Sequence, residues 1–245
     1  MLDSCSLDLS DCLEMSEFTA EELRGLSLFS SLTDEQCVLL LSRHLESSHA
    51  PDQVFVMEQD WGESVFLLRS GLAKVRSFTA DGDEVVMSVL GTGDVFGEMA
   101  ALDGAPRSAD VVALTPLQLV KMRAAPFSAL LKDQPSFSLA LAQLMASRLR
   151  NLNQRFALQS GDATTRMLDT LAYLASKHSP DADPMAEIPC IAQKEIALIA
   201  GLARETASRT LSKLRTRGTV KEASGGGLQL CDLDPLRKRG LMPRP

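Results

Sequence analysis

The sequence predicts an α+β protein with an N-terminal antiparallel β-roll, one long helix and a C-terminal winged helix-turn-helix. Short β-rich runs recur between residues 53 and 122, a helical period replaces them after Pro126, and two short helices and three glycines follow near the end. The expected parts are an acidic flexible leader, a β-roll domain, a dimerisation helix and a winged helix-turn-helix domain, over residues 1–23, 24–130, 131–160 and 161–245.

The first 23 residues hold seven acidic side chains and no basic one, which is typical of a flexible leader. A helix is expected near residues 19–26, where Thr19 can cap and two glutamates favour the first turn. A second short helix is expected after Thr33, over residues 34–41.

The β-rich runs that follow are separated by glycines at intervals of roughly ten residues, as in antiparallel rolls, barrels and sandwiches. Asp81-Gly82 lies between two of these runs and is a strong hairpin signal. The expected strands are Gln53–Met57, Ser64–Leu68, Ala73–Ser77, Glu84–Val89, Ala109–Leu114 and Gln118–Met122.

A long helix is expected from Pro135 to about Gln159. Apolar residues recur in its second half at spacings of 4, 3 and 4, which matches one side of a heptad stripe about two heptads long. The stripe consists of Met145, Leu149, Leu152 and Phe156. It favours a parallel pairing of two copies of this helix; the alternative is a helix that packs only on its own β domain.

The remaining segment begins with Asp162, a good N-cap for a helix over residues 163–177. A loop at residues 179–184 precedes two short helices, near Gln193–Ala200 and Arg204–Arg217. The glycines at 225–227 predict the turn of a small hairpin, the wing.

Charge is divided unevenly along the chain. The whole sequence has 25 basic and 32 acidic residues, a net charge of −7. Residues 188–245 hold 11 of the basic and 5 of the acidic side chains, a net of +6. An acidic body with a basic end is expected when one domain contacts a phosphate backbone, although a solvated basic face would look the same.

Composition excludes several classes of protein. The longest uncharged stretch has fourteen residues, Gln134–Ser147, too short to span a membrane. No basic residue precedes Arg24, so a secretory signal is not expected. The five cysteines form no C-x-x-C pair, which predicts reduced thiols and a cytoplasmic location. A cluster of Cys5, Cys12 and Cys37 is the alternative.

No constellation of catalytic or metal-ligating residues is visible, so we expect neither an enzyme nor a metal site. His44, His49 and His178 are isolated, and no paired carboxylates or Ser-His-Asp pattern stands out.

The segment Phe96–Ala109 has the chemistry of a nucleotide site. Gly97 permits close approach of backbone to a ligand, and a turn at Glu98–Ala100 would direct amides at an anion. Arg107 can bind phosphate through two donors, whereas the Glu98 carboxylate suits a sugar hydroxyl. A turn with a surface salt bridge is the plainer alternative.

This segment resembles the cyclic-nucleotide-binding cassette of the catabolite-activator (CRP/FNR) family, F-G-E-x-A-L followed by P-R-[SA]-A. The matching residues are Gly97, Glu98, Ala100, Pro106, Arg107, Ser108 and Ala109, whereas Ala101 replaces the usual Leu. The resemblance implies that Glu98 takes the ribose 2′-OH and that Arg107 and Ser108 bind the cyclic phosphate, helped by the amide of Met99 or Ala100.

The resemblance also places base contacts on the long helix, at Leu152 and Asn153. Leu152 cannot hydrogen-bond an adenine amino group, which leaves Asn153 as the ligand-binding candidate there. The implied effector is a cyclic nucleotide, with cAMP favoured and cGMP as the alternative.

Residues 193–211 read as a helix-turn-helix in which Gly201 makes the sharp turn. Ile196, Ala197, Leu202 and Ala207 are expected to face inward. The second helix exposes Arg204, Glu205, Ser208 and Arg209 near its start, with Lys213 further along. Arginine pairs bidentately with guanine, and glutamate accepts from cytosine.

The window from Gly201 to Arg209 closely resembles the G-x-[ST]-R-E-T-x-x-R recognition helix of the same family. The resemblance implies that Arg204, Glu205 and Arg209 read bases in inverted TGTGA-like half-sites and that Thr206 contacts phosphate. Thr210 replaces a bulkier aliphatic residue.

We therefore expect a homodimeric, sequence-specific transcription regulator that binds double-stranded DNA, with RNA polymerase as a candidate further partner. A cyclic nucleotide would bridge the β-roll and the long helix near Asn153 and so bring the reading helices into register. One rival is a ligand-independent or redox-gated regulator that depends on the three N-terminal cysteines. Another is a nucleotide-binding regulatory subunit without DNA contact.

Overall fold

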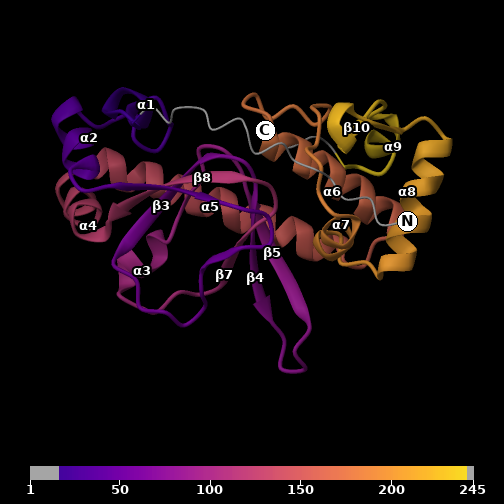
Figure 1. Cartoon of the computed structure of the whole chain (residues 1–245), viewed down its shortest axis with the longest axis horizontal. Coiled ribbons are helices and arrows are strands. Elements are labelled where there is room, and N and C mark those ends of the chain that lie inside the picture. Colours follow the sequence, from indigo (N-terminus) through magenta and orange to yellow (C-terminus); the bar gives the residue numbers. More distant parts are fainter. Residues whose placement is uncertain (1–16, 242–245) are drawn as a thin grey trace.

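The computed structural model describes residues 17–241, apart from the side chain of Ser224, and confirms the predicted fold class (Figure 1). A two-sheet antiparallel domain is followed by a long helix and a small helical domain with a two-stranded hairpin. Most of the predicted acidic leader, residues 1–16, lies outside the described residues.

Two short helices precede the sheets, as the sequence predicts. Helix α1 spans Ala20–Arg24 and helix α2 spans Asp34–Leu41. Each begins at a capping box. The side chain of Thr19 or Thr33 accepts from the backbone N–H of Glu22 or Gln36, and the side chain of that residue accepts from the backbone N–H of the threonine.

The β-roll consists of two four-stranded antiparallel sheets with orders β1-β8-β3-β6 and β2-β7-β4-β5. All six predicted strands are present, and the sequence missed β1 and β6. The strands are β1 (Leu45–His49), β2 (Val54–Val56), β3 (Ser64–Ser70), β4 (Ala73–Phe78), β5 (Glu84–Leu90), β6 (Val95–Phe96), β7 (Asp110–Ala113) and β8 (Leu117–Arg123).

The hairpin predicted at Asp81-Gly82 joins β4 to β5. Gly82 has a φ of +86°, a conformation that a residue without a Cβ adopts freely. The Thr79 amide bonds the Asp83 carbonyl, and the Gly82 amide bonds the Thr79 carbonyl. Strand β5 is therefore held by β4 on one side and forms an edge of its sheet.

Helices α4 (Ala124–Asp133) and α5 (Pro135–Leu158) connect the roll to the C-terminal domain. Phe127 of α4 and Phe137 of α5 are fully buried and pack edge to face, with ring centroids 5.2 Å apart. This contact fixes the start of the long helix on the roll.

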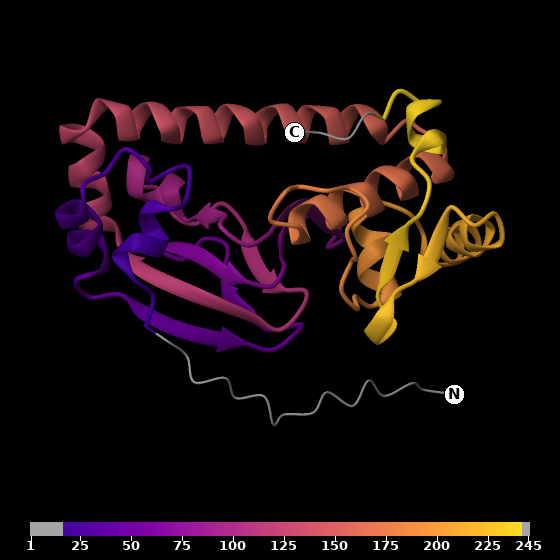
Figure 2. The same ribbon diagram turned by 90° about the horizontal axis from the view of Figure 1, so that it is seen from above.

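Figure 2 shows that the β-roll and the C-terminal domain both lie on one side of α5. The second half of α5 carries apolar side chains that remain exposed. Leu149, Leu152 and Phe156 are 59%, 40% and 73% exposed. The predicted heptad stripe is thus unpartnered over most of its length.

The C-terminal domain consists of helices packed beside a two-stranded hairpin, as predicted. Asp162 caps α6 by accepting the Thr165 amide at 2.7 Å. The elements are α6 (Ala163–His178), α7 (Gln193–Ile199), α8 (Arg204–Thr216), β9 (Val220–Glu222), the 3-10 turn η1 (Ser224–Gly226), β10 (Leu228–Leu230) and α9 (Asp234–Arg237).

This domain docks on the edge strand β5 (Figure 1). The Tyr173 hydroxyl accepts from the Val89 amide at 3.1 Å and donates to the Val89 carbonyl at 3.0 Å. Arg155 of α5 donates to the carbonyls of Met87 and Ile199, at 3.2 and 3.0 Å. Side chains therefore satisfy the backbone of β5 where a further strand would otherwise pair.

A buried ionic cluster completes the docking. Lys74 of β4 contacts the carboxylate of Glu195, which lies on α7. Its Nζ also lies 2.5 Å from Glu84 Oε1, close enough for an ion pair but outside hydrogen-bond geometry. The side chains of Lys74 and Glu195 are 3% and 7% exposed. A charge pair withdrawn from water thus joins the β-roll to the helix-turn-helix.

Candidate functional site

The turn at Gly97 shapes one cavity of the β-roll. Gly97 has a φ of +80° and directly precedes α3 (Glu98–Asp103). A Cβ built there would lie 2.5 Å from Arg107 Nη1 and 3.1 Å from the Ser64 carbonyl oxygen. Both the conformation and the space require glycine at this position. The predicted close approach of this backbone to a ligand stays a prediction.

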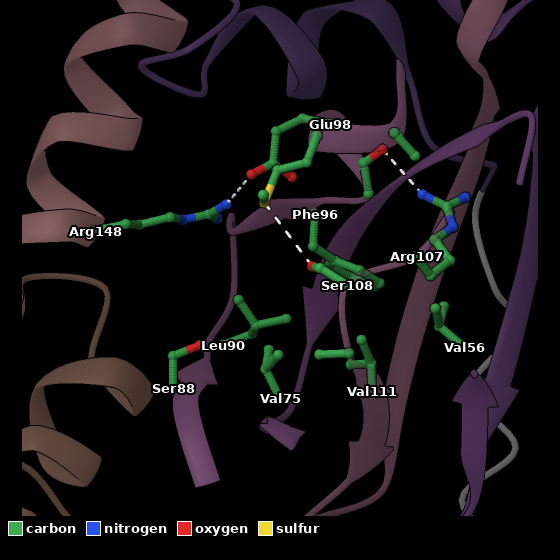
Figure 3. A pocket seen from close by; sticks show the side chains of 14 residues that line it. Val56, Val75, Ser88, Leu90, Phe96, Glu98, Arg107, Ser108, Val111 and Arg148 are labelled. Atoms are coloured by element: carbon green, nitrogen blue, oxygen red, sulfur yellow. Dashed lines mark hydrogen bonds and ion pairs between the residues drawn. The ribbon is translucent and has the colours of Figure 1, made fainter. Parts of the chain in front are cut away.

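The cavity beside this turn has a volume of about 170 Å³ and gathers the predicted residues of the β-roll. Figure 3 shows Arg148 entering from α5 and apolar side chains of the sheet below it. The lining residues are Val56, Val75, Ser88, Leu90, Phe96, Gly97, Glu98, Met99, Ala100, Arg107, Ser108, Ala109, Val111 and Arg148.

Arg107 is a buried cation with no ion pair among the described residues. Its guanidinium donates to the Gly97 carbonyl at 2.9 Å and the Ser64 carbonyl at 2.6 Å, and it lies over the Phe66 ring. Burial lowers its pKa from the ordinary value, against the opposing pull of nearby carboxylates, yet a guanidinium stays protonated. A buried cation that forms no ion pair favours an anionic ligand.

Gly62 is a site residue that sequence reasoning missed. A Cβ at this position would lie 2.3 Å from Arg107 Nη2. Gly62 therefore provides the space in which the guanidinium lies. The only signal was a glycine in the loop before β3, and that signal does not specify a partner 45 residues away.

Glu98 is buried in the same cavity and forms an ion pair with Arg148. Arg148 Nη1 donates to Glu98 Oε1 at 2.7 Å, and its other terminal nitrogen donates to the Val95 carbonyl. Arg148 Nη2 also lies 3.8 Å from Asp94 Oδ1. This side chain connects α5 to the cavity, and the sequence analysis did not identify it as a site residue.

A second cavity of about 300 Å³ lies against α5 and shares Ser88, Leu90, Glu98, Met99 and Arg148 with the first. The residues that line the second cavity but not the first are Met87, Val89, Met145, Leu149, Asn151, Leu152, Arg155, Tyr173 and Lys177. Asn153, the predicted base contact, is exposed and lines neither cavity.

The helix-turn-helix is formed by α7 and α8, with the predicted sharp turn between them. Gly201 has a φ of +60°, and the Leu202 amide bonds the Ala197 carbonyl at 2.9 Å. Ile196, Ala197 and Ala207 are buried as predicted, and Leu202 packs against the same core from a half-buried position.

The outer face of α8 presents the predicted reading residues to solvent. Thr206 is half-buried, whereas the others are exposed: Arg204, Glu205, Ser208, Arg209 and Lys213. None of the three cations in that set forms an ion pair within residues 17–241. Thr210 is buried and donates to the Thr206 carbonyl at 2.7 Å, which accounts for a polar residue at this core position.

Within the described residues, no group of three or more His, Cys, Asp and Glu side chains is arranged to hold a metal ion. In the same part of the chain, no helix has the length and apolar character needed to cross a membrane.

Two domain families match this chain. The cyclic nucleotide-binding domain matches residues 46–134, and the Crp-like helix-turn-helix domain matches residues 165–239.

Curated relatives match over most of their length. The cyclic AMP receptor protein of Thermus thermophilus is 30% identical over 204 residues, 83% of this chain and 92% of the relative. The CRP-like cAMP-activated global transcriptional regulator of Mycobacterium tuberculosis is 27% identical over 184 residues, 74% and 82%. The structure of FixK2 from Bradyrhizobium japonicum shares the fold, with a TM-score of 0.69 at 20% identity, over 80% of this chain and 96% of that one.

Proposed function

This chain belongs to the CRP/FNR family of transcription regulators, and we propose that it is a homodimer whose sequence-specific DNA binding is switched by a cyclic nucleotide. The family consists of regulators and not of enzymes. The proposal includes a cytoplasmic location and RNA polymerase as a further partner.

The observation that carries the nucleotide proposal is the buried charge of Arg107. Ligand phosphate replaces one of its two carbonyl partners, and Ser108 adds a hydroxyl donor from the same cavity. Glu98 accepts from the ribose 2′-OH through a carboxylate that the hydrogen bond from Arg148 orients. The names of both curated relatives point to cAMP, which we favour over cGMP.

The exposed face of α8 supports the DNA proposal. Arg204, Glu205 and Arg209 read base edges in the major groove, Thr206 and Lys213 contact phosphate, and Ser208 is exposed beside the base readers. Two copies related by a two-fold axis match inverted TGTGA-like half-sites about one helical turn apart.

The exposed apolar stripe on α5 supports the dimer. Leu149, Leu152 and Phe156 would be covered by the same residues of a second copy, as in a parallel two-stranded coiled coil. Each nucleotide cavity then lies beside the dimer interface, because Arg148 and Leu152 come from the same helix.

The switch acts through β5. Ser88 and Leu90 of this strand line the nucleotide cavity, while the backbone of Met87 and Val89 is bonded to Arg155 and Tyr173. A ligand that moves β5 therefore changes the position of the helix-turn-helix relative to the β-roll. The ligand must favour the DNA-competent state by a few kcal/mol to drive such a change.

Calorimetric titration of the purified full chain with cAMP, cGMP and cyclic di-GMP tests this function. Fluorescence anisotropy with a duplex that carries inverted TGTGA half-sites follows DNA binding in parallel. We expect cAMP to bind and to tighten the DNA complex. Arg107→Ala should abolish nucleotide binding with an unchanged circular dichroism spectrum, whereas Arg43→Ala, an exposed arginine outside the cavity, should not affect it.

Absence of calorimetric binding by all three nucleotides, with DNA binding intact, would favour the ligand-independent alternative. The redox-gated version has little support at Cys37, because burial raises the pKa of this thiol and keeps it in the unreactive protonated form. Cys5 and Cys12 lie outside the described residues. If the wild type bound nucleotide but no DNA, the alternative of a nucleotide-binding regulatory subunit would be favoured.

A further inference from the structure

The second cavity continues the first on the α5 side, and Glu98 and Arg148 belong to both. If the proposed function holds, a nucleotide with its phosphate at Arg107 and its sugar at Glu98 extends its base into this second cavity. The side chains that line the second cavity are therefore the candidates for recognition of the base.

Most polar side chains that line the second cavity are already committed to other partners. Arg148 bonds Glu98, Arg155 bonds the carbonyls of two neighbouring elements, and the Tyr173 hydroxyl bonds Val89. Lys177 Nζ donates to Asp94 Oδ2 at 2.7 Å. A base that recruited any of these groups would have to break a bond that holds the fold together.

Among the described residues, Asn151 and Ser88 are not committed in this way, and of the two only Asn151 can both donate and accept through a planar amide. Its side chain lines the cavity, is half-buried, and has no hydrogen-bond partner within residues 17–241. Apolar side chains surround it along the same wall, including Met99, Leu149 and Leu152. These give a flat purine an apolar contact surface, while a single carboxamide offers directional bonds.

A carboxamide has one acceptor oxygen and a nitrogen that donates. Adenine presents a donor, its 6-amino group, beside an acceptor ring nitrogen, so the two groups pair bidentately. Guanine presents two acceptors on the corresponding edge, O6 and N7, and needs two donors from one group. The guanidinium groups in this cavity, Arg148 and Arg155, are both engaged.

We propose that Asn151 reads the nucleobase in this chain and makes adenine the preferred base, an inference that rests on the proposed function. Leu152 supplies an apolar contact to the ring and no polar selection. Asn153, two residues along the helix, lies exposed outside the cavity and takes no part in recognition of the base within the same subunit.

The test compares two nearby amide substitutions in the full-length protein. Calorimetric titrations with cAMP and cGMP are made on the wild type, Asn151→Ala and the matched control Asn153→Ala. We expect Asn151→Ala to weaken cAMP binding about tenfold and to leave cGMP binding within about twofold, so that the preference for cAMP collapses. The control should retain both affinities.

A second measurement needs no substitution. The cyclic monophosphate of purine riboside lacks the 6-amino group, and the wild type should bind it about tenfold more weakly than cAMP. The Asn151→Ala variant should bind cAMP and the purine riboside nucleotide with equal affinity.

An unchanged ratio of cAMP to cGMP affinity in Asn151→Ala would overturn the inference while leaving the proposed function intact. Loss of the preference in Asn153→Ala instead would overturn it in the same way. Failure of the wild type to bind any of the three nucleotides would refute the proposed function itself, and the inference with it.

Discussion

Removal of the buried Lys74 charge should loosen the contact between the two domains. In Lys74→Met, the Glu195 carboxylate stays buried and loses its main cation. The nearest remaining one, Lys194, lies 3.8 Å away on a side chain that is 55% exposed. Glu84 keeps Arg76 at 3.2 Å, so one carboxylate rather than two is left uncompensated.

Loss of one partner from a buried pair costs about 3–5 kcal/mol. Because only Glu195 is left without its cation, we expect the lower end of this range: Lys74→Met should lower the free energy of unfolding by about 3 kcal/mol. The double variant Lys74→Met/Glu195→Met removes both charges and should return to within about 1 kcal/mol of the wild type. The second substitution should thus recover about 2 kcal/mol of the stability lost in Lys74→Met.

Urea denaturation followed by circular dichroism at one fixed protein concentration measures these differences. Lys221→Met, at an exposed position on β9, serves as the control and should stay within about 0.5 kcal/mol of the wild type. A double variant as unstable as Lys74→Met alone would refute the reasoning, since the loss would then come from packing and not from a stranded charge.

Three further outcomes follow from the structure. Arg209→Ala should cost about 1–3 kcal/mol on a TGTGA-type duplex in fluorescence anisotropy; an equal loss on a scrambled duplex would remove this residue as a base reader. Phe156→Glu places a charge on the exposed stripe of α5 and should shift the mass in analytical ultracentrifugation from dimer to monomer; a retained dimer would place the interface elsewhere. The amide of Thr165 holds the pKa of Asp162 below its ordinary value, so Asp162→Ala should lower stability by about 1 kcal/mol at pH 7. Because the folded-state pKa is depressed, this difference should vanish as pH falls through that pKa in thermal melts; a difference that persists there would contradict the capping role.

Local signals predicted most elements of the fold. The caps Thr19, Thr33 and Asp162 and the Asp81-Gly82 turn act within a few residues, so the sequence alone contains their physics. Strand β1, with the sequence LESSH, was missed because only Leu45 is strongly apolar. Its strand conformation comes from pairing with β8.

The candidate site was predictable only in part, for a related reason. Gly97, Glu98 and Arg107 lie close together in the sequence and were found there. Arg148, by contrast, reaches Glu98 across 50 residues, and no local pattern specifies that pairing. The helical rotation that brings Asn151 rather than Asn153 to the cavity depends on how α5 packs on the roll.

The docking on β5 also bears on the colloidal behaviour of the protein. This strand contains Val85, Val86, Met87 and Val89, and its free edge is covered by side chains and not by another strand. Any state in which the C-terminal domain separates from β5 exposes an apolar strand edge. A strand of a second molecule can then pair with that edge. The domain movement that regulation requires thus also promotes aggregation. Light scattering should rise with protein concentration under any condition that separates the domains.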